Sequence, residues 1–123
     1  MRTNFYTNTA TKPAPSFGQL NQCGGSYYIL KRVLQADEFE ELEKLTAKQV
    51  NSLVDVNLYQ VKEYSNKLRA ELIPNSEFLG FRTMKQKFFE STMSFINRCC
   101  DEADRLNGII VRSREKYPEG NIV

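Results

Sequence analysis

The stretch that decides the predicted fold is FRTMKQKFFESTMSFINRCCDEADRLNGII, residues 81–110. Its apolar residues recur in steps of three and four, which predicts one face of an α-helix. That face consists of Phe81, Met84, Phe88, Thr92, Phe95, Cys99, Ala103, Leu106 and Ile110. A second row widens the apolar arc to about half of the helix circumference: Phe89, Met93, Ile96 and Cys100. We therefore expect a central helix with more than one neighbour, and with Phe88 and Phe95 almost fully buried.

Two further helices are predicted upstream of this stretch. Asp37 and Glu40 have the spacing of a capping box, which predicts a short helix over residues 38–45. Thr46 and Gln49 repeat the spacing and predict a longer helix over residues 46–72, which Pro74 would end. Since the connection around Pro74 is short, the expected fold class is all-α, a small antiparallel helical hairpin or bundle.

Residues 27–34 fit two kinds of secondary structure. Tyrosine and β-branched residues favour a strand there, whereas Leu30, Val33 and Leu34 also fit one face of a helix. A strand would need a partner, and residues 109–111 form the other β-rich candidate. The helical fold therefore leaves room for a minor two-stranded β element from residues 27–34 and 109–111.

The domain organisation follows from composition. Residues 1–25 are rich in Thr, Asn, Pro, Gly and Ser and are predicted to form an extended N-terminal arm. Residues 26–111 would form the helical domain, and residues 112–123 a polar C-terminal tail. Large apolar side chains in the arm suggest docking on a partner or on a second copy, against two outward residues of the second helix. The predicted partner-binding residues are Phe5, Tyr6, Phe17, Leu20, Val56 and Tyr59.

Composition restricts the class of protein. The chain has 123 residues, of which 41% are hydrophobic and 26% charged, which is typical of one soluble globular domain. No apolar run approaches the length of about 20 residues that spans a bilayer, and the N-terminus lacks the apolar core of a signal peptide. We therefore expect no membrane partner and a cytoplasmic location, or a virus particle assembled in the cytoplasm.

Nothing in the sequence predicts catalysis. The chain has no histidine, which removes the commonest general base near neutral pH and the commonest metal ligand. Cys23, Cys99 and Cys100 match no zinc-binding pattern, and the last two lie in the apolar arc. We accordingly expect no enzyme activity, no cofactor, no bound metal and no small-molecule substrate.

Two functions remain as hypotheses. The first is a structural or assembly protein that binds a protein partner or forms a homo-oligomer through its arm and helical faces, as a subunit of a larger complex or virus particle. The second is a nucleic-acid-binding module, because residues 1–36 carry four basic side chains and no acidic one. The residues predicted for nucleic-acid binding are Tyr27, Tyr28, Lys31, Arg32, Arg112, Arg114 and Lys116.

Overall fold

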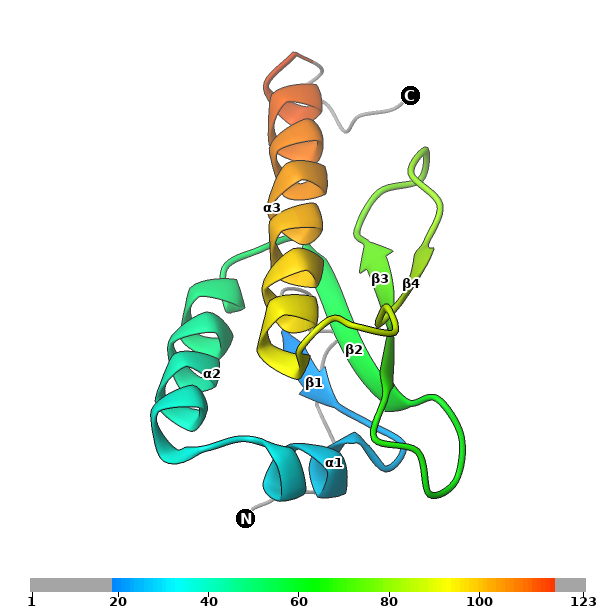
Figure 1. The fold of residues 1–123 in the computed structure, drawn as a ribbon. Helices are drawn as coiled ribbons and strands as arrows, with labels where there is room; N and C mark the ends of the chain where they lie inside the picture. The colour runs from blue at the N-terminus through cyan, green and yellow to red at the C-terminus, as the bar shows by residue number, and fades with distance from the viewer. Residues whose placement is uncertain (1–18, 117–123) are drawn as a thin grey trace.

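The computed structural model describes residues 19–116, which fold into a four-stranded sheet and three helices (Figure 1). In chain order the elements are β1 (Leu20–Gln22), α1 (Ser26–Val33), α2 (Ala36–Gln49), β2 (Val54–Gln60), β3 (Leu68–Pro74), β4 (Arg82–Lys85) and α3 (Thr92–Lys116). The strands are arranged β1-β2-β3-β4, with β1 parallel to β2 and the other pairs antiparallel. This is an α/β fold with a mixed sheet, so the all-α prediction is wrong.

The largest error concerns the predicted helix over residues 46–72, most of which forms β2 and β3. In both strands buried and half-buried residues alternate, as expected when one face of a sheet is covered. Val54, Leu58, Leu68 and Leu72 fit a helical stripe as well as this alternation, because a spacing of four satisfies both periods. The pairing of β2 with β3 decides between the two. It places three alternate residues of each strand in the core: Val54, Val56 and Leu58, and Leu68, Ala70 and Leu72.

The central helix is confirmed only in part, because α3 begins at Thr92. Phe95 is fully buried, as expected, but Phe88 is 78% exposed and Phe81 is 67% exposed. The helix starts late because the Ser91 Oγ accepts a hydrogen bond from the Ser94 N–H at 3.2 Å, an N-cap arrangement. Residues 82–85, which precede this cap, pair with β3 instead.

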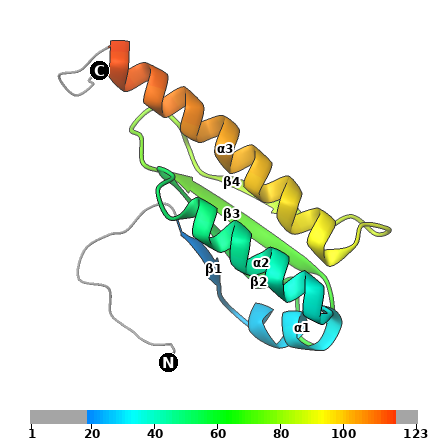
Figure 2. The same cartoon turned by 90° about the vertical axis from the view of Figure 1, so that its left-hand side faces the viewer.

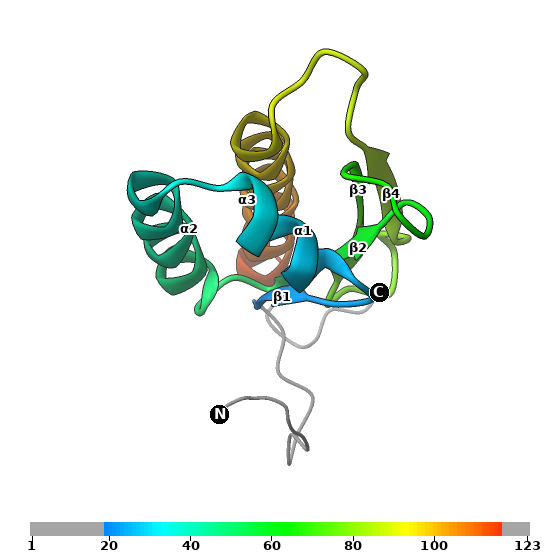
Figure 3. The same ribbon diagram turned by 60° about the horizontal axis from the view of Figure 1, so that its bottom comes forward.

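Among residues 19–116, the helices cover one face of the sheet. Figures 2 and 3 show α2 and α3 on the same side of the sheet, with α1 at the end where β1 leads into it. The core between these layers is contiguous and includes Phe95, Ile96, Cys99, Cys100, Ala103, Leu106 and Ile110 of α3. Within residues 19–116, no helix is both long and apolar enough to cross a membrane.

Of the remaining secondary-structure predictions, one is wrong and one is confirmed, and the structure shows parts of the predicted arm and tail. Residues 27–34 are helical up to Val33, and residues 109–111 belong to α3, so the suggested two-stranded β element is wrong. The predicted helix over residues 38–45 is confirmed within α2, although its capping box joins Gln35 and Glu38. Part of the predicted arm forms β1, and α3 continues to Lys116 in the predicted tail.

Candidate functional site

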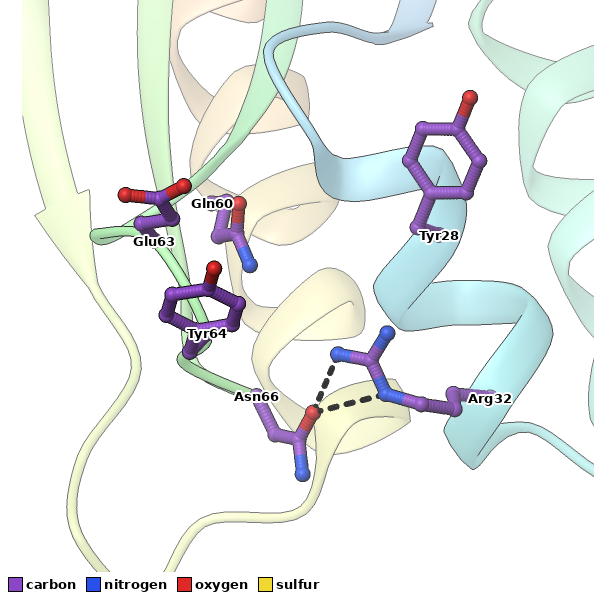
Figure 4. A pocket seen from close by; sticks show the side chains of 6 residues that line it. All are labelled: Tyr28, Arg32, Gln60, Glu63, Tyr64 and Asn66. Carbon is purple, nitrogen blue, oxygen red and sulfur yellow. Dashed lines mark hydrogen bonds between the residues drawn. The ribbon is translucent and has the colours of Figure 1, made fainter.

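A pocket of about 450 Å³ lies between α1 and the loop that joins β2 to β3, residues 61–67 (Figure 4). Its lining combines two aromatic rings, one cation, one carboxylate and two amides: Tyr28, Arg32, Gln60, Glu63, Tyr64 and Asn66. Tyr28 and Arg32 are four residues apart on α1, which places them on the same side of the helix. The sequence had assigned both to a nucleic-acid site, and the structure brings them together.

Gly25 and Gln60 hold the two sides of the pocket at a fixed separation. Gly25 precedes α1 in a left-handed conformation with φ of 82°, and a Cβ at this position would overlap with the Gln60 side chain. The Gln60 Nε2 donates a hydrogen bond of 2.9 Å to the Ser65 carbonyl oxygen, which ties the loop back to the end of β2. The close approach of the start of α1 to the end of β2 therefore depends on a glycine.

Arg32 brings a positive charge that no salt bridge among the described residues neutralises. Its Nε and Nη2 both donate to the Asn66 Oδ1, at 3.2 and 2.6 Å, so its partner is a neutral amide. In Figure 4 the Glu63 carboxylate points away from the Arg32 guanidinium. The pocket can therefore attract an anion, since a guanidinium keeps donors for a second partner.

Two exposed tyrosines lie on either side of the Arg32 guanidinium. Tyr28 is 68% exposed on α1, and Tyr64 is 91% exposed at the tip of the loop. Tyr64 has a φ of 68°, which is uncommon for any residue other than glycine. Two rings beside a guanidinium can stack on a planar group and hold its negative charge.

A second exposed surface is formed by residues 78–89, here called the β4 segment. It contains β4 and the adjoining parts of the loops on either side of it, with Phe78, Phe81, Phe88 and Phe89 all exposed, the last by 94%. The segment also carries Arg82, Lys85 and Lys87 and has no acidic residue. The sequence prediction had placed most of its apolar residues in the core, whereas the fold places these four phenylalanines at the surface.

The loop after β4 is held in place by polar contacts to its neighbours. The Arg98 Nε and Nη2 donate to the Glu90 carboxylate at 2.8 and 2.9 Å, and this pair lowers the pKa of Glu90 to about 2. The Lys67 Nζ donates to the Phe88 carbonyl oxygen at 2.8 Å. Phe88 and Phe89 therefore project from a loop with a defined backbone path, with their rings in edge contact.

The residues predicted for nucleic-acid binding do not all meet. Tyr27 and Lys31 lie on α1 beside the pocket residues, and the Lys31 Nζ is 5.3 Å from the centroid of the Tyr27 ring. Arg112, Arg114 and Lys116 lie in the last turns of α3, at the opposite end of the molecule (Figure 1). The Arg114 Nη2 donates to the Asn75 carbonyl oxygen there, at 3.0 Å.

The residues predicted for partner binding are also dispersed. Leu20 and Val56 are paired across β1 and β2 and are buried in the core. Tyr59 lies on the uncovered face of the sheet, where the Arg69 guanidinium is 4.4 Å from the centroid of its ring. Phe5, Tyr6 and Phe17 lie outside the described residues. The three positions that the structure describes do not form one surface.

Sequence reasoning missed the loop residues of the pocket and the exposure of the β4 segment. A turn composition, Glu63-Tyr64-Ser65-Asn66, was the signal for the loop. For the β4 segment, the signal was a run of three cations without an acidic residue, because a helix packed on two sides normally carries both signs of charge on its outer face. Neither signal says which elements meet in space.

The three cysteines differ in exposure. Cys99 and Cys100 are buried, and burial raises the pKa of each thiol to about 12. Cys23 is half-buried, and burial also raises the pKa of its thiol. Residues 19–116 contain no cluster of three or more side chains of the types that commonly bind metals.

Comparisons of this chain with protein-family models, curated proteins and solved structures found no match. The two surfaces described above, the pocket and the β4 segment, are therefore the features from which a function is inferred.

Proposed function

We propose that this chain is a non-enzymatic protein-binding module, a structural or assembly subunit that docks through its β4 segment. The observation that carries the proposal is the exposure of four phenylalanines, two before and two after one short edge strand in the chain. Large apolar side chains that remain exposed in the folded chain are typical of protein interfaces when several lie along one element. The cytoplasm, or a virus particle assembled there, is the expected setting.

The free energy gained by burying the four phenylalanines is similar to the free energy that association costs. Burying one such side chain contributes roughly 1.5–3 kcal/mol, so four contribute roughly 6–12 kcal/mol. Association costs about 4–15 kcal/mol in lost freedom of motion, which is of the same size. The phenylalanines could therefore anchor a complex, while hydrogen bonds or charges must add to them.

The proposed surface differs from the one expected from sequence. Leu20 and Val56 contribute to the chain's own core, so a partner could reach them only if β1 left the sheet. The β4 segment instead offers apolar side chains without any change in the fold. The proposal still assigns protein binding to this chain, as expected from the sequence, but it assigns the binding to the β4 segment instead of to the arm, Val56 and Tyr59.

The test compares capture of proteins by three versions of the full chain from an extract of its native source. We expect wild type and Val50→Ser, a change at the exposed residue that directly follows α2, outside the segment, to retain the same proteins. The double variant Phe88→Ser/Phe89→Ser should lose them, and quantitative mass spectrometry measures the difference. Equal retention by all three versions, or retention that nuclease abolishes, would contradict the proposal.

A second candidate function, binding of single-stranded nucleic acid, is favoured by the pocket. Tyr28 and Tyr64 are exposed on either side of Arg32, whose charge is not neutralised by a salt bridge among the described residues. Stacked bases and a gripped phosphate are the usual features of such sites, and their affinity falls steeply with salt.

Fluorescence anisotropy with a labelled oligouridine tests this candidate. Arg32→Gln and Tyr64→Ala should each weaken binding about tenfold, by the loss of a phosphate contact or a stacked base. Arg112→Gln, at the far end of α3, is the control and should have little effect. If Arg32→Gln binds as well as wild type, or if the wild type does not bind at low salt, the pocket is not a nucleic-acid site.

A further inference from the structure

We infer that the β4 segment binds an extended acidic segment of a partner protein, which adds to the sheet as a fifth strand beside β4. The inference rests on the proposed protein-binding function and names the chemistry of the partner. It follows from the direction of the backbone groups of β4, from the charges on this strand and from the phenylalanines that flank it.

The backbone of β4 has an unpaired side. β4 is the last strand of the sheet and pairs with β3 among the described strands. The Gln86 N–H donates to the Leu68 carbonyl oxygen at 3.0 Å, which makes these two residues a directly bonded pair of the antiparallel ladder. Since direct bonding alternates along such a ladder, Arg82 and Met84 also face β3, and Thr83 and Lys85 direct their backbone groups outward.

Part of this outer edge is already used. The Arg98 Nη2 donates to the Lys85 carbonyl oxygen at 2.8 Å, so that oxygen has a partner. The Thr83 N–H, the Thr83 carbonyl and the Lys85 N–H remain directed outward, with no described strand opposite them. A partner strand centred on Thr83 would meet both a donor and an acceptor, as strand addition requires.

The charges around the edge select an acidic partner. Arg82 pairs with the buried Leu72, and Lys85 pairs with Arg69 of the uncovered face, so the two cations lie on opposite faces of the sheet. Two acidic side chains near the edge are themselves bonded to arginines, Glu71 to Arg69 at 3.3 Å and Glu102 to Arg105 at 2.6 Å. Glu71 lies opposite Thr83, and the pKa of Glu102 is lowered by the hydrogen bond from Arg105 and also by the nearby charge of Arg82. An added strand with carboxylates on either face would therefore meet a cation on each side.

The same charges disfavour a second copy of this chain as the partner. Pairing two β4 strands would bring two sets of Arg82, Lys85 and Lys87 together, and facing like charges destabilise a sheet. Residues 1–18 contain Arg2 and Lys12 and no acidic residue, so charge gives them no preference for this edge either. A partner of different sequence fits best.

The phenylalanines would secure the ends of the added strand. Phe81 immediately precedes β4, and Phe88 follows it by three residues. Because β4 has four residues, a bound segment of about six to eight residues would extend past both of its ends. Apolar side chains near the ends of that segment and acidic ones in its middle would match the edge.

The test uses two fluorescein-labelled peptides, acetyl-Leu-Val-Glu-Asp-Glu-Ile-Leu-amide, whose adjacent acidic residues lie on both faces of an extended strand, and the same peptide with lysine at its three acidic positions. Fluorescence anisotropy with the full chain should show at least tenfold tighter binding of the acidic peptide at low salt. Thr83→Pro removes the outward N–H and should weaken binding at least tenfold, whereas Thr83→Val keeps the N–H and should bind like wild type. Equal binding of the two peptides, or equal binding by the two variants, would overturn the inference.

Hydrogen exchange gives a second measurement that does not depend on the folding of a proline variant. In the wild-type chain, saturating acidic peptide should slow exchange of the Thr83 amide at least tenfold, and exchange of buried α3 amides should not change. An unchanged Thr83 rate with bound peptide would rule out strand addition.

The outcome separates this inference from the proposed function. If Phe88→Ser/Phe89→Ser loses the captured proteins while Thr83→Pro keeps them, the chain binds protein but not by strand addition. If both variants keep them, the β4 segment is not the binding surface and both proposals fail.

Discussion

Arg98 on α3 and Glu90 in the loop after β4 form a two-point contact, with the Nε to Oε2 distance at 2.8 Å and the Nη2 to Oε1 distance at 2.9 Å. The Glu90 side chain is 9% exposed, so this pair is more shielded from water than the other ion pairs of the described residues. The contact joins the loop that carries Phe88 and Phe89 to the helix beneath it. Removing it should loosen the surface to which we assign protein binding.

Glu90→Gln should lower the free energy of unfolding by about 1–2 kcal/mol at pH 7, because a charge-assisted pair is replaced by a neutral one. The folded-state pKa of Glu90 is about 2, below its ordinary value of 4.5. Its contribution is therefore complete above about pH 4.5 and is lost as the pH falls toward 2. Urea denaturation at a series of pH values measures this contribution.

The control for this prediction is Glu102→Gln, which breaks the Glu102–Arg105 pair along α3, where the arginine side chain is 54% exposed. It should cost less than about 0.5 kcal/mol, since exposed pairs on one helix contribute little. If wild type and Glu90→Gln lose stability in parallel between pH 4.5 and 2, Glu90 does not contribute as stated.

Phe95 and Phe88 belong to the same predicted helix face but should respond differently to truncation. Phe95→Ala should cost about 3–5 kcal/mol, because it empties a fully buried site. Phe88→Ala should change stability by less than about 0.5 kcal/mol, because the ring is mostly in solvent. Denaturant titration of the two variants distinguishes this fold from a helix over residues 81–110, which predicts large losses for both.

Gly25→Ala should destabilise the chain by at least about 1–2 kcal/mol, the cost of a left-handed conformation for a residue with a Cβ. The added Cβ would also overlap with the Gln60 side chain and push the start of α1 away from the end of β2. Gly80→Ala is the matched control: nothing lies within 4 Å of an added Cβ there, so the change should be less than about 1 kcal/mol. Equal thermal shifts for the two variants would contradict the placement of α1 against β2.

The cysteines should react in a fixed order. Cys23 is half-buried, so iodoacetamide should modify it first, although burial raises the pKa of its thiol and slows the reaction at pH 8. Cys99 and Cys100 should react only after denaturant is added, because they are buried and the pKa of each thiol is about 12. Peptide mapping by mass spectrometry follows the three sites, and early modification of Cys99 would show that the core is open.

Part of the candidate site could be predicted from the sequence. Tyr28 and Arg32 were named because an aromatic and a cation lay close together in the chain, and a helix keeps residues four apart on one side. Tyr64 and Asn66 were not named, since Asn66 meets Arg32 across 34 positions of the sequence. Contacts between residues so far apart in sequence depend on how α1 and the β2–β3 loop are placed in space. No local sequence pattern predicts that placement.

The sequence by itself determined the second half of the central helix and the existence of α2. Cys99, Ala103, Leu106 and Ile110 repeat at helical spacing and are all buried on α3, because a helix is stabilised by contacts within a few residues and its period is local. Only the tertiary structure decided the sheet. Strands gain their hydrogen bonds from partners that are distant in sequence. Val56 is in the core because β1 and β3 pair with β2 on either side of it. Phe88 is in solvent because residues 82–85 pair with β3 instead of continuing the helix.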